Sequence, residues 1–151
     1  VKEASRIVGD LGNKFGKLSE YLVVPNLLEK FQALGYRFTK ASRNIRIVDS
    51  ATGKTLTEID ALLEDGDSSM VVEIKSDLGL DYIRQHVERM EKLRRYFDEH
   101  HDGRRLLGAV AGAIMEDRVK EHALAAGFYA IVQSGDTVKI DAPKWFKPKA
   151  W

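Results

Sequence analysis

Residues 57–75 constrain the fold more than any other stretch of this chain. Two alternating runs flank Asp65-Gly66-Asp67-Ser68, which predicts a β-hairpin with Gly66 in the first central position of a type II′ turn. Residues at equal distances from this turn are then paired across the two strands. The pattern therefore predicts that Asp60 lies opposite Glu73, with Glu58 opposite Lys75, and that all four side chains share one face.

The other face of the predicted hairpin is almost wholly apolar. Side chains alternate across a strand, so this face collects the residues at odd positions of the first strand and even positions of the second. The set consists of Thr57, Ile59, Ala61, Leu63, Met70, Val72 and Ile74. We therefore expect this face to pack into a core.

Two acidic residues opposite each other need a physical reason. Like charges on directly opposed residues destabilise a strand pair. A divalent cation between Asp60 and Glu73 would supply the reason, because Mg²⁺ takes oxygen ligands and commonly one or two carboxylates. Two alternatives stay open: a solvated polar face in which Lys75 balances the carboxylates, or a one-residue bulge that sends the two acids to opposite faces.

The arrangement resembles the PD-(D/E)XK nuclease superfamily, which has the restriction-endonuclease-like fold. The matching residues are an acid on one strand, Asp60, and Glu-x-Lys on the next, Glu73 and Lys75. Ile59 stands in place of the superfamily's Pro. The context also matches, with an upstream helix that carries a Glu and an amphipathic helix after Lys75. The resemblance covers about residues 12–135.

The resemblance implies a metal-dependent active site. Asp60 and Glu73 would bind Mg²⁺ or Mn²⁺ together with the backbone carbonyl of Ile74, and Glu20 would complete or brace the site. Lys75 would orient or activate the attacking water and offset charge on the phosphorus.

Three further residues have weaker assignments. Glu20 lies among apolar neighbours on the upstream helix, but a lone helical Glu commonly reaches solvent past such neighbours. Glu58 is expected to pair with Lys75 or to lie just behind the metal ligands, and a structural role for it is equally open. Gln85 lies in the first turns of the helix expected after the motif, where superfamily members often carry a Gln or a Lys near the site.

The rest of the pattern predicts an α/β fold with a central mixed β-sheet flanked by helices on both faces. One strand is expected to run parallel to the Glu73 strand, after a long helix. We expect helices at 1–34 (broken near Pro25), 81–100 and 116–126, and further strands at 36–40, 45–49, 106–115, 128–133 and 137–140. Residues 1–140 would form a single domain, followed by a tail or linker at 141–151.

Composition limits the functions that fit. There is no apolar run of about 18 residues, so we expect no membrane-spanning helix. Cysteine is absent, which excludes disulfides and thiolate metal sites and fits a cytoplasmic protein. The net charge is only +1, so any nucleic-acid surface must be a local basic patch.

The sequence therefore predicts a metal-dependent nuclease that hydrolyses phosphodiester bonds in DNA. The alternative is a catalytically inactive module of the same fold that binds nucleic acid or a protein partner. A third interpretation is an unrelated sheet protein whose hairpin carries only polar surface. DNA is the expected partner, no membrane is expected, and a homodimer that cuts both strands stays open.

Overall fold

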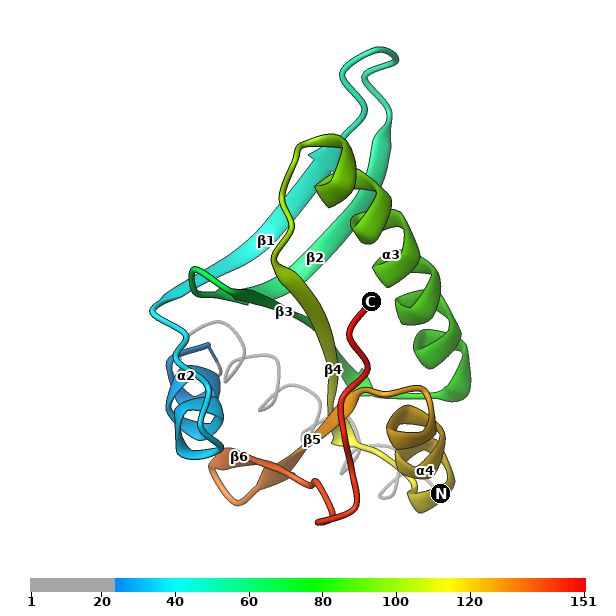
Figure 1. The fold of residues 1–151 in the computed structure, drawn as a ribbon. Helices are drawn as coiled ribbons and strands as arrows, with labels where there is room; N and C mark the ends of the chain where they lie inside the picture. Colours follow the sequence, from blue (N-terminus) through cyan, green and yellow to red (C-terminus); the bar gives the residue numbers. More distant parts are fainter. Residues whose placement is uncertain (1–23) are drawn as a thin grey trace.

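A computed structural model describes residues 24–151 of the chain (Figure 1). A six-stranded mixed sheet with the order β1-β2-β3-β4-β5-β6 forms its centre. The described elements are α2 (Val24–Ala33), β1 (Lys40–Val48), β2 (Thr55–Glu64), β3 (Ser68–Asp77), α3 (Leu80–Glu99), β4 (Arg105–Ile114), α4 (Asp117–Ala125), β5 (Tyr129–Ser134) and β6 (Thr137–Ile140). The predicted α/β fold class is confirmed.

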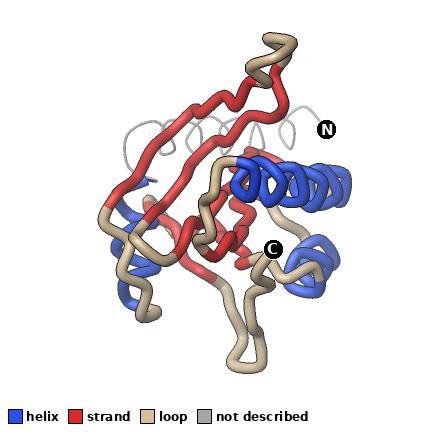
Figure 2. The backbone as a smooth tube through the Cα atoms, turned by 45° about the horizontal axis from the view of Figure 1, so that its top comes forward, coloured by secondary structure: helices blue, strands red, loops and turns tan. Residues whose placement is uncertain are grey.

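Helices cover both faces of the sheet, as Figures 1 and 2 show. Helix α2 packs on one face, over a buried cluster that includes Phe31, Met70 and Val72. Helix α3 packs on the other, over a second cluster that includes Ile83 and Val71, and α4 joins α3 there. Strands β3, β4 and β5 are parallel, so the predicted parallel strand after the long helix is also confirmed. No helix within residues 24–151 is long and apolar enough to cross a membrane.

The β2–β3 hairpin has the predicted register but a different turn. Ala61 pairs with Val72, as equal distance from the turn requires. Gly66 does not have the positive φ that a type II′ turn needs, so that turn type is wrong. The Asp65 carboxylate instead accepts hydrogen bonds from the backbone N–H groups of Asp67 (2.6 Å) and Ser68 (2.7 Å). This Asx-type turn needs no left-handed residue.

The predicted alternation of side chains fails at Asp60. Ala61 lies in the α2-side cluster as expected, but Ile59 lies in the α3-side cluster and Thr57 accepts a hydrogen bond from a side chain of α3. The prediction that all three share a face is therefore wrong. Asn44 lies at the matching position of β1, where its φ of 53° is left-handed and interrupts the regular ladder. Irregularities of this kind re-aim side chains in a strand pair.

Strand β1 is longer than the sequence indicates. Two short strands at 36–40 and 45–49 with a loop between them were expected, whereas residues 40–48 form one strand paired along β2. Asn44 adopts its left-handed conformation inside this strand. The polar residues Ser42-Arg43-Asn44 therefore form a local distortion instead of a loop, and the pairing with β2 continues on either side of it. The remaining helices and strands match the predicted ranges to within about one residue, apart from the region outside the described residues.

The segment 141–151 lies along the body of the protein. Its backbone N–H groups at Lys149 and Trp151 donate to the carbonyls of Gly127 (3.1 Å) and Leu106 (2.8 Å). The Trp151 ring stacks on Phe128 with a centroid distance of 5.6 Å. In Figure 1 this segment is the red trace that ends between β4 and α3. The last residues of the chain thus complete the packing beside α3 and α4.

Gly108 in β4 provides a test of this packing. A Cβ atom at position 108 would lie 2.6 Å from the Phe128 ring, which is held between Trp151 and His86. We expect Gly108→Ala to lower the free energy of unfolding by about 1–3 kcal/mol, measured by urea denaturation. Gly103→Ala is the control, because its Cβ would meet nothing within 4 Å. Equal stabilities of the two variants would contradict the described contact.

Candidate active site

The candidate site forms where β2 separates from β3. The last residue pair of their ladder is Ala61 with Val72. One residue further, the Asp60 carboxylate takes the place of a backbone acceptor: its Oδ2 accepts a hydrogen bond of 2.8 Å from the N–H of Ile74. The break in alternation at this position therefore turns the Asp60 side chain towards β3. This holds the carboxylate beside Glu73, the neighbour of Ile74 on β3.

Glu73 is a buried acid with two cationic partners. Its side chain is only 6% exposed. One oxygen, Oε1, lies 3.5 Å from the ammonium of Lys75. The other, Oε2, forms an ion pair with the guanidinium of Arg89, which extends from α3. Each carboxylate oxygen thus has its own positive partner.

The ionisation of Glu73 reflects this environment. Burial raises the pKa of Glu73 above its ordinary value, because the charged form loses contact with water. The positive charge of Arg89 opposes the rise, and the neighbouring Asp60 carboxyl, within hydrogen-bond reach of Glu73, adds to it. The structure therefore brings together the two carboxyl groups that the hairpin pattern places opposite each other.

Arg89 changes the reason why two acids can lie so close. The sequence alone suggested that a metal ion must offset their repulsion. Arg89 and Lys75 already place two positive charges against Glu73, and the Arg89 side chain is only 16% exposed. A buried carboxylate of this kind is tolerated when it is paired and hydrogen-bonded. The proximity of the acids is therefore compatible with a metal but does not by itself require one.

The other residues predicted for the site are placed as follows. Glu58 pairs with Arg46 at 3.4 Å rather than with Lys75, and its side chain is 64% exposed. Gln85 is exposed and lines a cleft next to the site. Ile74 contributes its N–H to Asp60, as described above. Glu20 lies outside the described residues.

Three side chains at the site were missed by sequence reasoning. Arg89 donates from Nε to Thr57 Oγ1 (3.2 Å), and its NH1 lies 2.8 Å from His86 Nδ1. The available signal was the helical spacing of α3: Arg89 directly precedes the buried Met90 and follows the buried His86 by three residues. An arginine at the edge of the buried face of a helix needs an acidic partner. Glu73 on the preceding strand is that partner for Arg89.

His86 is fully buried and its tautomer follows from its contacts. Its Nε2 lies 3.1 Å from the carbonyl oxygen of Val71, which can only accept, so Nε2 carries the proton. Nδ1 is then bare and accepts from the guanidinium of Arg89. Burial, reinforced by the charge of Arg89, lowers the pKa of His86 from its ordinary 6.5 to about 3. His86 is therefore neutral at physiological pH.

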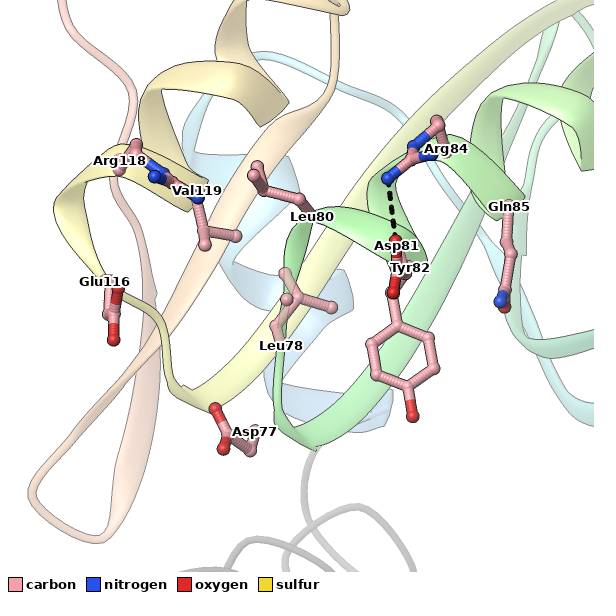
Figure 3. Close-up of a pocket in the computed structure, with 11 residues that line it drawn as sticks. Asp77, Leu78, Leu80, Asp81, Tyr82, Arg84, Gln85, Glu116, Arg118 and Val119 are labelled. Atoms are coloured by element: carbon pink, nitrogen blue, oxygen red, sulfur yellow. Dashed lines mark hydrogen bonds and ion pairs between the residues drawn. The ribbon is translucent and has the colours of Figure 1, made fainter.

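A cleft of about 530 Å³ adjoins the site (Figure 3). It lies at the carboxyl ends of the parallel strands β3 and β4, and the first turns of α3 and α4 line it. Tyr82 connects the cleft to the site, because its ring lies 5.0 Å below the ammonium of Lys75 and also forms part of the cleft wall. Figure 3 shows Arg84 paired with Asp81 at its rim. Ligands of α/β proteins commonly bind at this end of parallel strands.

The donor set at the site fits a hard divalent cation in part. Asp60 and Glu73 supply carboxylate oxygens, the ligand type that Mg²⁺ and Mn²⁺ prefer. Within residues 24–151, no group of three or more acidic or His side chains is arranged to hold a metal ion. This part of the chain therefore offers two carboxylate ligands, and water or a residue elsewhere would have to complete the shell.

A solved structure resembles the backbone of this chain weakly. It is the crystal structure of the small subunit of a heterodimeric restriction endonuclease, with a TM-score of 0.40 and 17% sequence identity. The similarity covers 85% of this chain and 72% of that subunit. No protein family and no curated protein matches the sequence. A similarity this weak carries no information about activity, so the candidate site rests on its own contacts.

The buried His86 predicts a pH dependence of stability. Below pH 6.5 the unfolded chain binds a proton that the folded chain, with a His86 pKa of about 3, does not. The free energy of unfolding should therefore decrease as the pH is lowered from 6.5 to 5, by up to roughly 1 kcal/mol per pH unit. Urea denaturation of the wild type and of His86→Gln at pH 7.5, 6.5 and 5.5 measures the effect. The free energy of unfolding should depend less steeply on pH in His86→Gln than in the wild type, whereas the exposed His100→Gln should behave like the wild type. Equal pH dependence in all three proteins would contradict the role of His86.

Proposed function

We propose that this chain is a metal-dependent nuclease of the PD-(D/E)XK type that hydrolyses phosphodiester bonds in DNA. The observation that carries the proposal is the grouping of Asp60, Glu73 and Lys75 at the point where β2 and β3 separate. Two carboxylates within reach of each other, with an ammonium beside them, match the chemistry that phosphodiester hydrolysis needs. The cleft beside Lys75 leaves space for a substrate.

Asp60 and Glu73 would bind Mg²⁺ or Mn²⁺ together with the Ile74 carbonyl, and Glu20 would be a further ligand or brace. A divalent cation bound there supplies positive charge that activates water and stabilises the leaving oxygen. The hydrogen bond from Ile74 N–H fixes the orientation of the Asp60 carboxylate, so this ligand is held before any metal binds.

Lys75 would act on the water and the phosphate. Its side chain is 39% exposed and its ammonium lies over the Tyr82 ring, so it can reach solvent in the cleft while remaining near Glu73. From this position the ammonium can hydrogen-bond to the attacking water and offset the negative charge that develops around phosphorus. Lys75 contacts Glu73 at 3.5 Å, a distance that leaves it free to turn towards a substrate.

A second candidate function is a catalytically inactive module that binds nucleic acid or a protein partner. The observation that favours it is that both oxygens of Glu73 already have cationic partners in Lys75 and Arg89. A carboxylate neutralised in this way holds its strand and helix together without a metal. This function predicts binding of DNA without metal-dependent turnover.

Cleavage assays separate the two functions. Linear, supercoiled, single-stranded and branched DNA are incubated with the protein, with and without Mg²⁺ or Mn²⁺. We expect metal-dependent cleavage that Asp60→Asn and Lys75→Met each reduce by about 100-fold or more. Asn at position 60 keeps an oxygen for the Ile74 N–H, and Met keeps most of the lysine stem, so both changes mainly remove charge.

The matched controls are Asp136→Asn and Lys139→Met, which make the same chemical changes at exposed positions around the β5–β6 turn. Both should cleave like the wild type. Cleavage that survives Asp60→Asn and Lys75→Met would rule out the proposed site. DNA binding without cleavage by the wild type, under every metal condition, would instead support the inactive module.

A further inference from the structure

Arg89 lies at the centre of a network that joins three elements of the fold. Its NH1 contacts Glu73 on β3 and His86 on α3, and its Nε donates to Thr57 on β2. The guanidinium is planar and its donors are fixed in direction, so three partners in different directions determine its position. With a side chain only 16% exposed, Arg89 has little room to adopt another one.

His86 holds the guanidinium of Arg89 in this position. It is fully buried beneath Phe128, with a ring-centroid distance of 4.7 Å, and it is anchored by Val71. Because its bare Nδ1 can only accept, it is a fixed acceptor for Arg89. Withdrawing Arg89 would leave a buried acceptor on His86 and a buried carboxylate oxygen on Glu73, both without partners, which is costly.

The two oxygens of Glu73 are consequently unequal. Oε2 is committed to the buried Arg89, whereas Oε1 faces Lys75, which is farther away at 3.5 Å and more exposed. A cation that approaches Glu73 can therefore displace the weak partner and bind Oε1, but it cannot readily displace Arg89. With Oε2 held by Arg89, Glu73 cannot bind two metal ions with one ion on each of its oxygens.

We propose that Arg89 is a positioning residue that occupies one carboxylate oxygen of Glu73 and restricts the site to a single divalent cation. This inference rests on the proposed nuclease function and deepens it, because it sets the metal stoichiometry. Arg89 thereby provides a fixed positive charge at the place where a second metal ion would bind Glu73. Thr57 and His86 act through Arg89 and do not themselves touch the metal.

Titration with Mn²⁺ tests the proposal without relying on catalysis. The electron paramagnetic resonance signal of free aqueous Mn²⁺ reports how many ions the intact chain binds and how tightly. We expect the wild type to bind one Mn²⁺ at Asp60 and Glu73, with binding lost in Asp60→Asn. Arg89→Met should bind Mn²⁺ more tightly, on the order of tenfold, because a positive charge next to the divalent ion is removed.

Arg95→Met is the matched control, since it removes the same charge from an exposed position on the same helix and should leave Mn²⁺ affinity unchanged. Circular dichroism shows whether each variant is folded. A structural role alone would weaken metal binding in Arg89→Met by loosening Glu73, so the direction of the change separates the two roles. Unchanged or weaker binding by the folded variant, or two Mn²⁺ ions on the wild type, would overturn the proposal.

Thr57→Val tests the role of Arg89 in metal binding if Arg89→Met does not fold. Val has nearly the shape of Thr and removes only the hydrogen bond to Arg89 Nε. It should tighten Mn²⁺ binding by about two- to threefold, and Thr57→Ser, which restores the hydroxyl, should reverse this. An unchanged affinity in Thr57→Val would count against the proposal. A wild type that binds no Mn²⁺ would reject the proposed nuclease function itself, whereas one bound ion with no response to either variant would reject the role of Arg89 alone.

Discussion

The buried carboxylate of Glu73 is the constraint on which the rest of the site depends. A carboxyl group that is only 6% exposed can carry its charge in a protein only with close positive partners. Arg89 meets that need from α3 and Lys75 meets it from β3 itself. The ion pair with Arg89 therefore ties the helix to the sheet at the candidate site.

A local irregularity in the sheet makes room for this arrangement. With regular alternation, Asp60 would point away from the sheet, on the side opposite to Ile59. The left-handed Asn44 and the end of the β2–β3 ladder turn it towards the Ile74 N–H instead. Sheets often depart from regular geometry near functional sites, because a side chain there must be aimed in a direction that the ladder does not provide.

The structure also changes what the proximity of two acids means. In the sequence, Asp60 opposite Glu73 suggests a metal ion because no other positive charge is assigned to them. In the fold, Arg89 supplies such a charge from sixteen positions further along the chain. The metal proposal accordingly depends on the hard oxygen ligands and on the accessible Lys75, and no longer on repulsion alone.

The sequence by itself determined the α/β class and the register of the hairpin, because strand periodicity and a short turn are local properties. It also indicated that Asp60 and Glu73 lie close together, but the direction of the Asp60 carboxylate depends on the break in alternation. Tertiary structure decided the rest. The face of Ile59 depends on Asn44 in another strand, and the partner of Glu58 is Arg46, the residue paired with it on the neighbouring strand β1. The contact between Arg89 and Glu73 arises only when α3 packs on the sheet, and no short-range pattern encodes which residues a helix face meets there.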